Sequence, residues 1–359
     1  MPSARLGAAE SIIRTLATGN SQLILVRTVT GLEPLAAAEM AEAGHRVIDI
    51  STRQLIIEPT AVSIITAPPR LADDLFLIAA DVPDPGRTKA DLATLVGALQ
   101  RTLAVPLAHD PGETISVSAS FLGRRTYSRF DIEDLAGRVI AEHTGGCYHS
   151  RRDGTRPPRQ RADWRVVLDG TRTRIAMRPF DAPLHRRDWR ARTVTGSLHP
   201  PVAAALARLA RIEPGHRVVD PLCGAGTILL EAQGLEPDTD YLGIDHDPTA
   251  IAAAEANTAS RRAEITWHRG DARDLLDSGT RVDRIVTNPP WDVRVRIDGF
   301  RSHLCLWRRA LNPDGLLVAI VNQEQAQLLR GEARWHIIAI HEIAVAGQHP
   351  RIVLAEPRA

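Results

Sequence analysis

The sequence predicts an α/β protein: a mostly parallel sheet, with helices on both faces, preceded by an α+β module. Two observations support this prediction. From about residue 197 onward, short apolar runs alternate regularly with helical patterns, which is typical of right-handed βαβ crossovers. Before that point, strands and helices follow one another without this alternation. At 359 residues the chain is long enough for two domains, each with its own core.

A helical stripe at residues 197–212 opens the C-terminal part. Another helix begins at Asp247 and Pro248, an N-cap residue followed by a first-turn proline. The predicted strands are 216–220, 241–245, 265–271, 284–288, 315–322, 335–345 and 351–357, and the other helices are 226–234, 299–311 and 323–330. Together they predict a seven-stranded sheet.

The N-terminal part is different and is ferredoxin-like in the order of its elements. Its predicted strands are 23–29, 45–50, 53–59, 114–121, 163–170 and 173–180, and its predicted helices are 31–44, 89–103 and 131–146. A loop rich in glycine, proline and arginine covers residues 149–163, and we expect the linker between the two parts near 192–197.

Composition places the chain among globular proteins, with 44% hydrophobic and 24% charged residues and a net charge of +1. No apolar run is long enough for a membrane span, and the N-terminus has no signal-peptide core. Cys147, Cys223 and Cys305 have neither paired nor metal-type spacing. We therefore expect a reduced, cytoplasmic protein without a structural metal; the oligomeric state is not predicted.

Arginines crowd the middle of the chain. Between residues 121 and 200 there are 17 arginines and nine acidic residues, an excess of eight. A local positive charge of this size suits a polyanion. A merely solvated face explains it equally well.

Polar residues end successive strands of the C-terminal part. Asp220 ends the first strand, and a turn with Cys223, Gly224 and Gly226 leads into a helix that begins at Thr227. Glycines in such a turn let a ligand approach the backbone at the carboxyl ends of the strands. By itself the G-x-G pattern could serve NAD or nothing, and Leu229 stands where a dinucleotide fingerprint has its third glycine.

The next two strands add carboxylates at the same edge. Asp245 ends the second strand, about twenty residues beyond the glycine turn, where it can hold both ribose hydroxyls. His246 either borders the cofactor or is a surface residue. Asp271, followed by Ala272, ends the third strand and can accept from an adenine amino group.

The fourth strand ends in Asn288, followed by Pro289, Pro290 and Trp291. Two prolines cannot continue a sheet ladder, so the backbone turns out of the sheet here. The Asn288 Oδ1 and Pro289 carbonyl oxygens can grip the hydrogens of an exocyclic amine and aim its lone pair. Trp291 offers a flat face for stacking a base. Catalysis would then consist of positioning and electrostatics.

These four strand ends give the chain a resemblance to a known family. Residues 197–359 resemble the Rossmann-like class I methyltransferases that use S-adenosyl-L-methionine and release S-adenosyl-L-homocysteine. The resemblance implies that Asp220, Cys223, Gly224, Gly226, Thr227, Asp245, His246, Asp271, Ala272 and Asn288 border the cofactor. In this family, Asn-Pro-Pro-aromatic motifs are associated with methylation of amide or amino nitrogen, which implies that residues 288–291 are catalytic.

The N-terminal half extends the resemblance. The segments 31–40, 125–140 and 182–190 resemble RNA methyltransferases that join a ferredoxin-like domain and a THUMP domain to this catalytic fold. Asp188 and Asp292 depart from the family, which usually has glycine at both positions. The implied domains are an N-terminal extension (1–20), a ferredoxin-like domain (21–120), a THUMP domain (121–192) and the methyltransferase domain (193–359).

The resemblance implies N2-methylation of a tRNA guanosine, of the acceptor-stem guanosine-6 type. THUMP domains bind the acceptor end of tRNA, which fits the arginine excess. The arginines expected to contact RNA are Arg124, Arg125, Arg151, Arg152, Arg186, Arg187 and Arg190. The alternatives are an rRNA guanine, a specialised amine substrate, or an RNA-binding protein with an inactive methyltransferase fold. No metal, membrane or further cofactor is expected.

Overall fold

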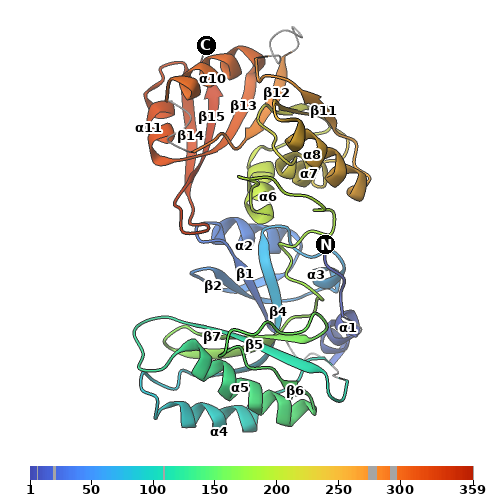
Figure 1. Ribbon diagram of the computed structural model, residues 1–359, viewed down its shortest axis with the longest axis vertical. Coiled ribbons are helices and arrows are strands. Elements are labelled where there is room, and N and C mark those ends of the chain that lie inside the picture. The colour runs from blue at the N-terminus through green and yellow to red at the C-terminus, as the bar shows by residue number, and fades with distance from the viewer. Residues whose placement is uncertain (6, 19–21, 108–109, 274–280, 292–296, 359) are drawn as a thin grey trace. The chain divides into compact units, whose positions relative to one another are not determined.

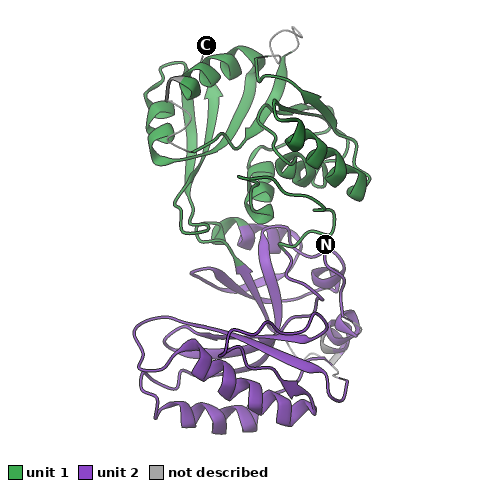
Figure 2. Ribbon diagram, in the orientation of Figure 1, with its two compact units in different colours: residues 1, 28–35, 185–359 green, residues 2–27, 36–184 purple. Residues whose placement is uncertain are grey.

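The computed structural model describes residues 1–5, 7–18, 22–107, 110–273, 281–291 and 297–358. The chain forms two compact units (Figure 2). The N-terminal unit comprises residues 2–27 and 36–184, and the C-terminal unit comprises residue 1, residues 28–35 and residues 185–359. Among the described helices, none is both long and apolar enough to cross a membrane.

The N-terminal unit is built on one eight-stranded sheet, with the order β2-β3-β1-β4-β8-β7-β5-β6. Figure 1 labels β1, β2, β4, β5, β6 and β7 of this sheet. Its strands are β1 (Ile24–Thr28), β2 (Arg46–Ser51), β3 (Gln54–Glu58), β4 (Ala72–Pro83), β5 (Thr114–Phe121), β6 (Cys147–Tyr148), β7 (Ala162–Leu168) and β8 (Arg172–Met177). Its helices are α1 (Ala8–Thr18), α2 (Glu33–Glu42, which begins in the C-terminal unit), α3 (Ser63–Thr66), α4 (Leu92–Thr102) and α5 (Arg129–Thr144).

Capping chemistry in the sequence explains where α5 begins and ends. Ser128 accepts the backbone N–H of Asp131, whose side chain accepts in return from the Ser128 backbone. This capping box satisfies two backbone donors that the first turn leaves unpaired. Gly145 ends the helix in the left-handed conformation, at φ 69°, which glycine adopts without strain.

The sequence prediction missed β4, β6, α1 and α3 in this unit. Strands from both sides of residue 120 share the single sheet, since β5 pairs in parallel with β7 over seven residue pairs. The division of this part into a ferredoxin-like and a THUMP domain stays a prediction.

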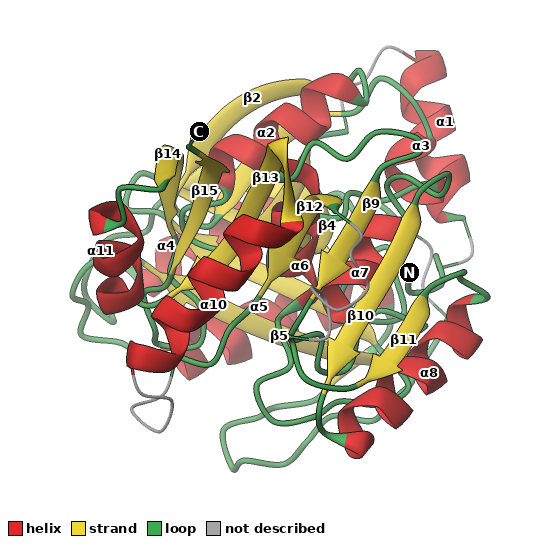
Figure 3. Cartoon of the chain, turned by 90° about the horizontal axis from the view of Figure 1, so that it is seen from above, coloured by secondary structure: helices red, strands yellow, loops and turns green. Residues whose placement is uncertain are grey.

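The C-terminal unit is built on a seven-stranded sheet with the order β11-β10-β9-β12-β13-β15-β14 (Figure 3). Its strands are β9 (Arg217–Asp220), β10 (Asp240–Asp245), β11 (Thr266–Arg269), β12 (Val282–Thr287), β13 (Leu311–Val321), β14 (Trp335–Glu342) and β15 (Arg351–Pro357). Its helices are α6 (Pro200–Leu209), α7 (Thr227–Gln233), α8 (Pro248–Arg261), α10 (Ile297–Ala310) and α11 (Gln323–Gly331). The strands from β11 to β13 pair in parallel, and β15 is antiparallel to both its neighbours. The predicted mostly parallel seven-stranded sheet is confirmed.

The inner strand β13 is buried on both faces of this sheet. Leu317, Ala319 and Val321 of β13 pack in one cluster with Trp307 of α10 and Leu329 of α11. The residues between them, Val318 and Ile320, point to the other face and are fully buried as well. Burial on both faces fits a parallel sheet covered by helices on each side, and it leaves the strand ends as the place for polar chemistry.

Candidate active site

The ends of β9, β10, β11 and β12 meet at one edge of the seven-stranded sheet, because these strands run in parallel. Backbone hydrogen bonds connect the segments that follow them. The Cys223 N–H donates to the Ile244 carbonyl at 2.9 Å, and the Gly270 N–H donates to the Asp245 carbonyl at 3.1 Å. The predicted strand-end residues of the sequence are therefore neighbours in the fold.

The glycine turn after β9 has two glycines with different roles. Gly224, at φ 53°, has space beside it: a Cβ there would lie 3.8 Å from the Val194 side chain. Gly226, at φ 76°, has none, because its Cβ would lie 2.5 Å from the Trp267 ring. Gly243 of β10 faces the same ring, at 2.2 Å. Gly226 and Gly243 are thus required by the indole of Trp267, whereas Gly224 leaves space open.

Asp245 is the carboxylate that ties the turn to β10. Its Oδ2 accepts the Gly224 N–H at 2.9 Å, and its Oδ1 accepts the Asp247 N–H at 2.9 Å. His246 is almost fully exposed, with its Nδ1 3.6 Å from Asp245 Oδ1. A carboxylate has about four acceptor positions, so Asp245 can still accept further hydrogen bonds.

Asp220 lies deeper, at the end of β9. It is 1% exposed, and burial raises the pKa of its carboxyl to about 7, against the opposing effects of the Thr287 hydroxyl and the Leu222 N–H. Burial also raises the pKa of the Cys223 thiol, so this cysteine is a packing residue rather than a nucleophile. Thr227 is buried at the start of α7.

Asp271 has a cationic partner that the sequence analysis missed. Arg273 donates to its Oδ1 at 2.8 Å and to its Oδ2 at 2.9 Å, and this hydrogen bonding lowers the pKa of Asp271 to about 2. Ala272 beside it is buried. The Asp271 carboxylate is therefore ionised and oriented, although it is shared with an exposed arginine.

A segment at residues 192–197 borders the turn and is held by one buried side chain. Asn257 of α8 accepts the Arg192 N–H at 2.9 Å and donates to the carbonyls of Arg192 and Ala225, each at 3.0 Å. Asn257 is fully buried, and its partners lie in other segments of the chain, so no local pattern in the sequence indicated it. Asn257 thus fixes this segment to the glycine turn.

The two polar atoms of the Asn288 side chain differ in their hydrogen bonding. Its Nδ2 donates to the Gly196 carbonyl at 3.4 Å. Its Oδ1 is buried and accepts no hydrogen bond from any residue that the structure describes. Buried acceptors are nearly always paired in proteins, so this oxygen at a strand end is a candidate acceptor for a ligand.

The rest of the turn is fixed by α11 and β13. The Pro290 carbonyl accepts from Gln325 at 2.8 Å, and the Trp291 carbonyl accepts from Asn322 at 3.1 Å. The Trp291 indole N–H donates to the Ile320 carbonyl at 3.0 Å. Pro289 is buried, and Asp292 lies outside the described residues. The Asn-Pro-Pro-Trp turn is therefore rigid, with Asn288 Oδ1 left available.

The arginines expected to contact RNA fall into three groups. Arg124 and Arg186 are exposed, and Arg190 is half-buried. Arg151 donates to Glu133 at 2.8 Å, and the exposed Arg152 pairs with Asp131 and Asp134.

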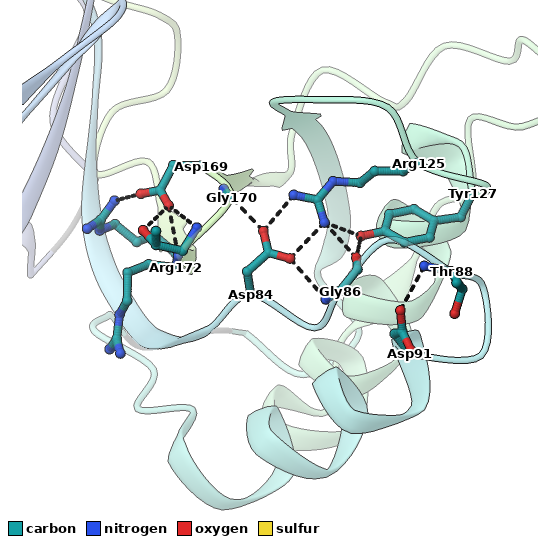
Figure 4. Close-up of polar contacts among 11 residues, drawn as sticks. Asp84, Gly86, Thr88, Asp91, Arg125, Tyr127, Asp169, Gly170 and Arg172 are labelled. Atoms are coloured by element: carbon teal, nitrogen blue, oxygen red, sulfur yellow. Dashed lines mark hydrogen bonds and ion pairs between the residues drawn. The ribbon is translucent and has the colours of Figure 1, made fainter.

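Arg125 and Arg187 belong to the interior of their units. Arg125 binds both oxygens of Asp84, at 2.7 and 2.6 Å, and also the Gly86 carbonyl and the Tyr127 hydroxyl (Figure 4). Arg187 is 4% exposed, and its Nε donates to the fully buried Glu231 at 2.7 Å. Both guanidiniums are already engaged within the protein, so we leave these two residues out of the proposed RNA contacts. A count of arginines could not reveal these pairings.

The residues at this edge fit S-adenosylmethionine. Gly224 leaves space beside the turn, Asp245 keeps acceptor positions free, and Asn288 Oδ1 is a buried acceptor without a partner among the described residues. These residues form an acidic, preformed edge that suits a cationic nucleoside.

Comparisons with known proteins agree with this geometry. The family model "RMKL-like, methyltransferase domain" matches residues 187–312. The tRNA (guanine(6)-N2)-methyltransferase of Thermus thermophilus is 33% identical over 273 residues, which cover 73% of this chain and 78% of that protein. The tRNA (guanine(10)-N2)-dimethyltransferase of Methanothermobacter thermautotrophicus is 36% identical over 174 residues, 48% of this chain and 50% of that one.

Solved structures cover nearly the whole chain. The crystal structure of TrmN from Thermus thermophilus has a TM-score of 0.79 and 26% identity, covering 94% of this chain and 99% of that one. SMU.472, crystallised with SAH, has a TM-score of 0.73 and covers 94% of this chain, but its 14% identity supports the fold alone. These similarities agree with the residues at the strand ends. The chain belongs to the family of S-adenosylmethionine-dependent guanine-N2-methyltransferases of RNA.

Proposed function

We propose that this protein methylates the N2 amine of a guanosine in tRNA, at the sixth nucleotide of the acceptor stem. The relatives that match most of the chain carry that activity in their names. The observation that supports the chemistry is the buried Asn288 Oδ1 without a partner in the described part of the chain.

Asn288 and Pro289 would orient the target amine. The guanine N2 amine is a poor nucleophile because its lone pair is delocalised into the ring. Asn288 Oδ1 would accept one amine hydrogen and the Pro289 carbonyl the other, which turns the nitrogen toward tetrahedral geometry and aims its lone pair at the methyl group. The neighbouring carbonyls of Pro290 and Trp291 already have donors, so these two acceptors are the ones left for substrate.

Rigidity is the chain's main contribution to this step. S-adenosylmethionine, when bound, supplies an electrophilic methyl group on a sulfonium, so no strong base is required. Gln325, Asn322 and the Trp291 indole fix the turn before the substrate arrives. Acceptors that are already oriented stabilise the transition state without reorganising. Trp291 would flank the base, with one ring edge fixed by the Ile320 carbonyl.

The test uses two tRNA transcripts that differ by one amine. The first has guanosine at position 6, and the second has inosine there, which lacks the exocyclic amine. With labelled S-adenosylmethionine, we expect N2-methylguanosine in the first transcript and no methyl at position 6 in the second, as read by nucleoside and fragment mass spectrometry. Equal labelling of both transcripts would contradict the proposal, and a methyl at another guanosine would correct the position.

A further inference from the structure

One face of the eight-stranded sheet in the N-terminal unit carries several arginines that are buried or partly buried. Leu25 of β1 and Val167 of β7 pack in the same cluster, together with Phe76 and Ala176. Side chains two residues apart on a strand point to the same face. Arg27 and Arg165 therefore share the face of this cluster, which we call the arginine face.

The neighbouring arginines of this sheet are paired with acids. Arg178 binds Asp74 through its Nε and Nη2 atoms and also pairs with Asp163. Arg174 pairs with Asp169 at 2.6 Å and with Asp81 at 3.3 Å. These four carboxylates are thus already engaged by guanidinium groups.

Arg27 and Arg165 hydrogen-bond only to neutral oxygens among the residues that the structure describes. Arg27 donates to the Gln54 side chain at 2.9 Å. Arg165 donates to the hydroxyls of Ser118 and Ser120, at 3.3 and 2.8 Å, and its Nε is buried without a partner in the same part of the chain. Two guanidiniums thus lie in one partly buried region without an ion pair to a described carboxylate.

A third arginine lies close to both. Arg53, in the turn between β2 and β3 with a positive φ of 65°, acts electrostatically on Arg27 and on Arg165. Burial and the guanidiniums of Arg165 and Arg53 lower the pKa of Arg27 to about 10, against the opposing effects of Asp73 and Asp74. Burial lowers the pKa of Arg165 as well, although Asp74 and Glu133 oppose the shift. Like charges gathered in a partly desolvated site are costly unless an anion binds between them.

We propose that Arg27, Arg165 and the Ser118 and Ser120 hydroxyls form a phosphate-binding site on the arginine face, occupied by a backbone phosphate of the RNA substrate. A phosphodiester accepts from forked guanidiniums and from hydroxyls, which are the donors present here. The identity of the occupant rests on the proposed function. Arg165 belongs to the arginine-rich stretch 121–192, whereas Arg27 lies outside it.

The first test compares the salt dependence of tRNA binding in two double variants. Arg27→Gln/Arg165→Gln removes the proposed contacts. Arg101→Gln/Arg138→Gln removes two exposed arginines of α4 and α5 and serves as the matched control. Each neutralised phosphate contributes roughly 0.7–0.9 to the slope of log Kd against log salt. Because the site holds one phosphate, we expect the slope to fall by roughly 0.7–0.9 in the first variant only; equal slopes in the two variants would overturn the site.

A charge-preserving variant covers the case in which the glutamine variant does not fold. Arg27→Lys/Arg165→Lys keeps both positive charges, so its salt slope should stay near that of the wild type while its Kd rises, because lysine lacks the fork. An unchanged Kd would count against the site.

Binding of inorganic phosphate distinguishes a site that binds the anion alone from a surface that binds only RNA. Phosphate should raise the melting temperature of the wild type more than that of Arg27→Gln/Arg165→Gln. An equal rise in both proteins would overturn the phosphate site. Methyl transfer by the wild type to a saturating concentration of tRNA tests the proposed function separately, because the salt slopes do not depend on catalysis.

Discussion

The two units treat their acidic residues differently. In the N-terminal unit, Asp74, Asp84 and Asp169 are each held by an arginine. At the strand ends of the C-terminal unit, Asp220 and Asp245 receive backbone N–H groups and have no arginine partner among the described residues. Acids of the first kind stabilise a sheet, whereas acids of the second kind keep acceptor positions for a ligand.

Asp271 and Glu231 refine this comparison. Both lie in the C-terminal unit and both have arginine partners, but the Asp271–Arg273 pair is exposed and the Glu231–Arg187 pair is buried. Two properties therefore distinguish structural acids from acids of the site: the kind of partner that the carboxylate has, and whether the pair is exposed or buried. The predictions below test this distinction in order of expected size.

The largest effect is expected at the buried pair. Arg187→Ala removes the guanidinium that is hydrogen-bonded to the buried Glu231 and should lower the free energy of unfolding by about 3–5 kcal/mol. Arg187→Met/Glu231→Leu removes both charges and should recover most of that loss. Urea unfolding followed by circular dichroism measures both variants. If the single and double variants are equally destabilised, the ion pair does not stabilise this unit.

Asp220 should make stability depend on pH. Its pKa is about 7 in the folded protein, against an ordinary value of 3.8, so between these values the folded protein binds more protons than the unfolded chain. The contribution of Asp220 to stability should therefore be full below about pH 4 and be lost as pH rises toward 7, by up to about 4 kcal/mol. Asp220→Asn should lack this fall in urea titrations without cofactor. Parallel pH curves for the two proteins would contradict the shifted pKa.

Gly226→Ala tests the packing behind the site. The new Cβ would meet the Trp267 ring at a positive φ, which should cost about 1–3 kcal/mol. Adding Trp267→Leu should recover the packing part of that loss but not the backbone part. Thermal melting and calorimetry of S-adenosylmethionine binding give both readouts. If the double variant recovers none of the lost stability, the Trp267 ring is not what requires glycine at position 226.

Trp291→Phe should have the smallest effect. It removes one hydrogen bond, to the Ile320 carbonyl, worth about 1 kcal/mol, and keeps a flat ring. Trp291→Ala should be more harmful to methyl transfer, since it also removes the ring. Equal activity of the two variants would exclude a role for the ring.

The strand ends could be predicted from the sequence because the signal is local. A polar residue directly after an apolar run marks the edge of a parallel sheet, and this placed Asp220, Asp245, Asp271 and Asn288 together. Their partners could not be predicted in this way, because Trp267 and Asn257 reach the glycine turn only through tertiary packing.

Strand β4 shows the same limit in the other unit. Aspartates are depleted in strands, and β4 contains Asp73, Asp74 and Asp81, which hid it from the sequence prediction. In the structure, Arg178 holds Asp74 and Arg172 holds Asp81 at 2.8 Å. Both partners are about ninety or more residues away along the chain, so no local pattern could indicate them.

The central claim is that Asn288 Oδ1 orients the substrate amine. It is tested most directly by single-turnover methyl transfer to an unmodified tRNA transcript. Asn288→Ala should slow the transfer step by about 10²–10³-fold, with melting and cofactor affinity close to those of the wild type. Asn312→Ala, which removes an amide bonded to Asp283, is the matched control and should transfer at the normal rate. A folded Asn288→Ala protein with near-normal transfer would reduce the Asn-Pro-Pro-Trp segment to a structural turn and contradict the claim.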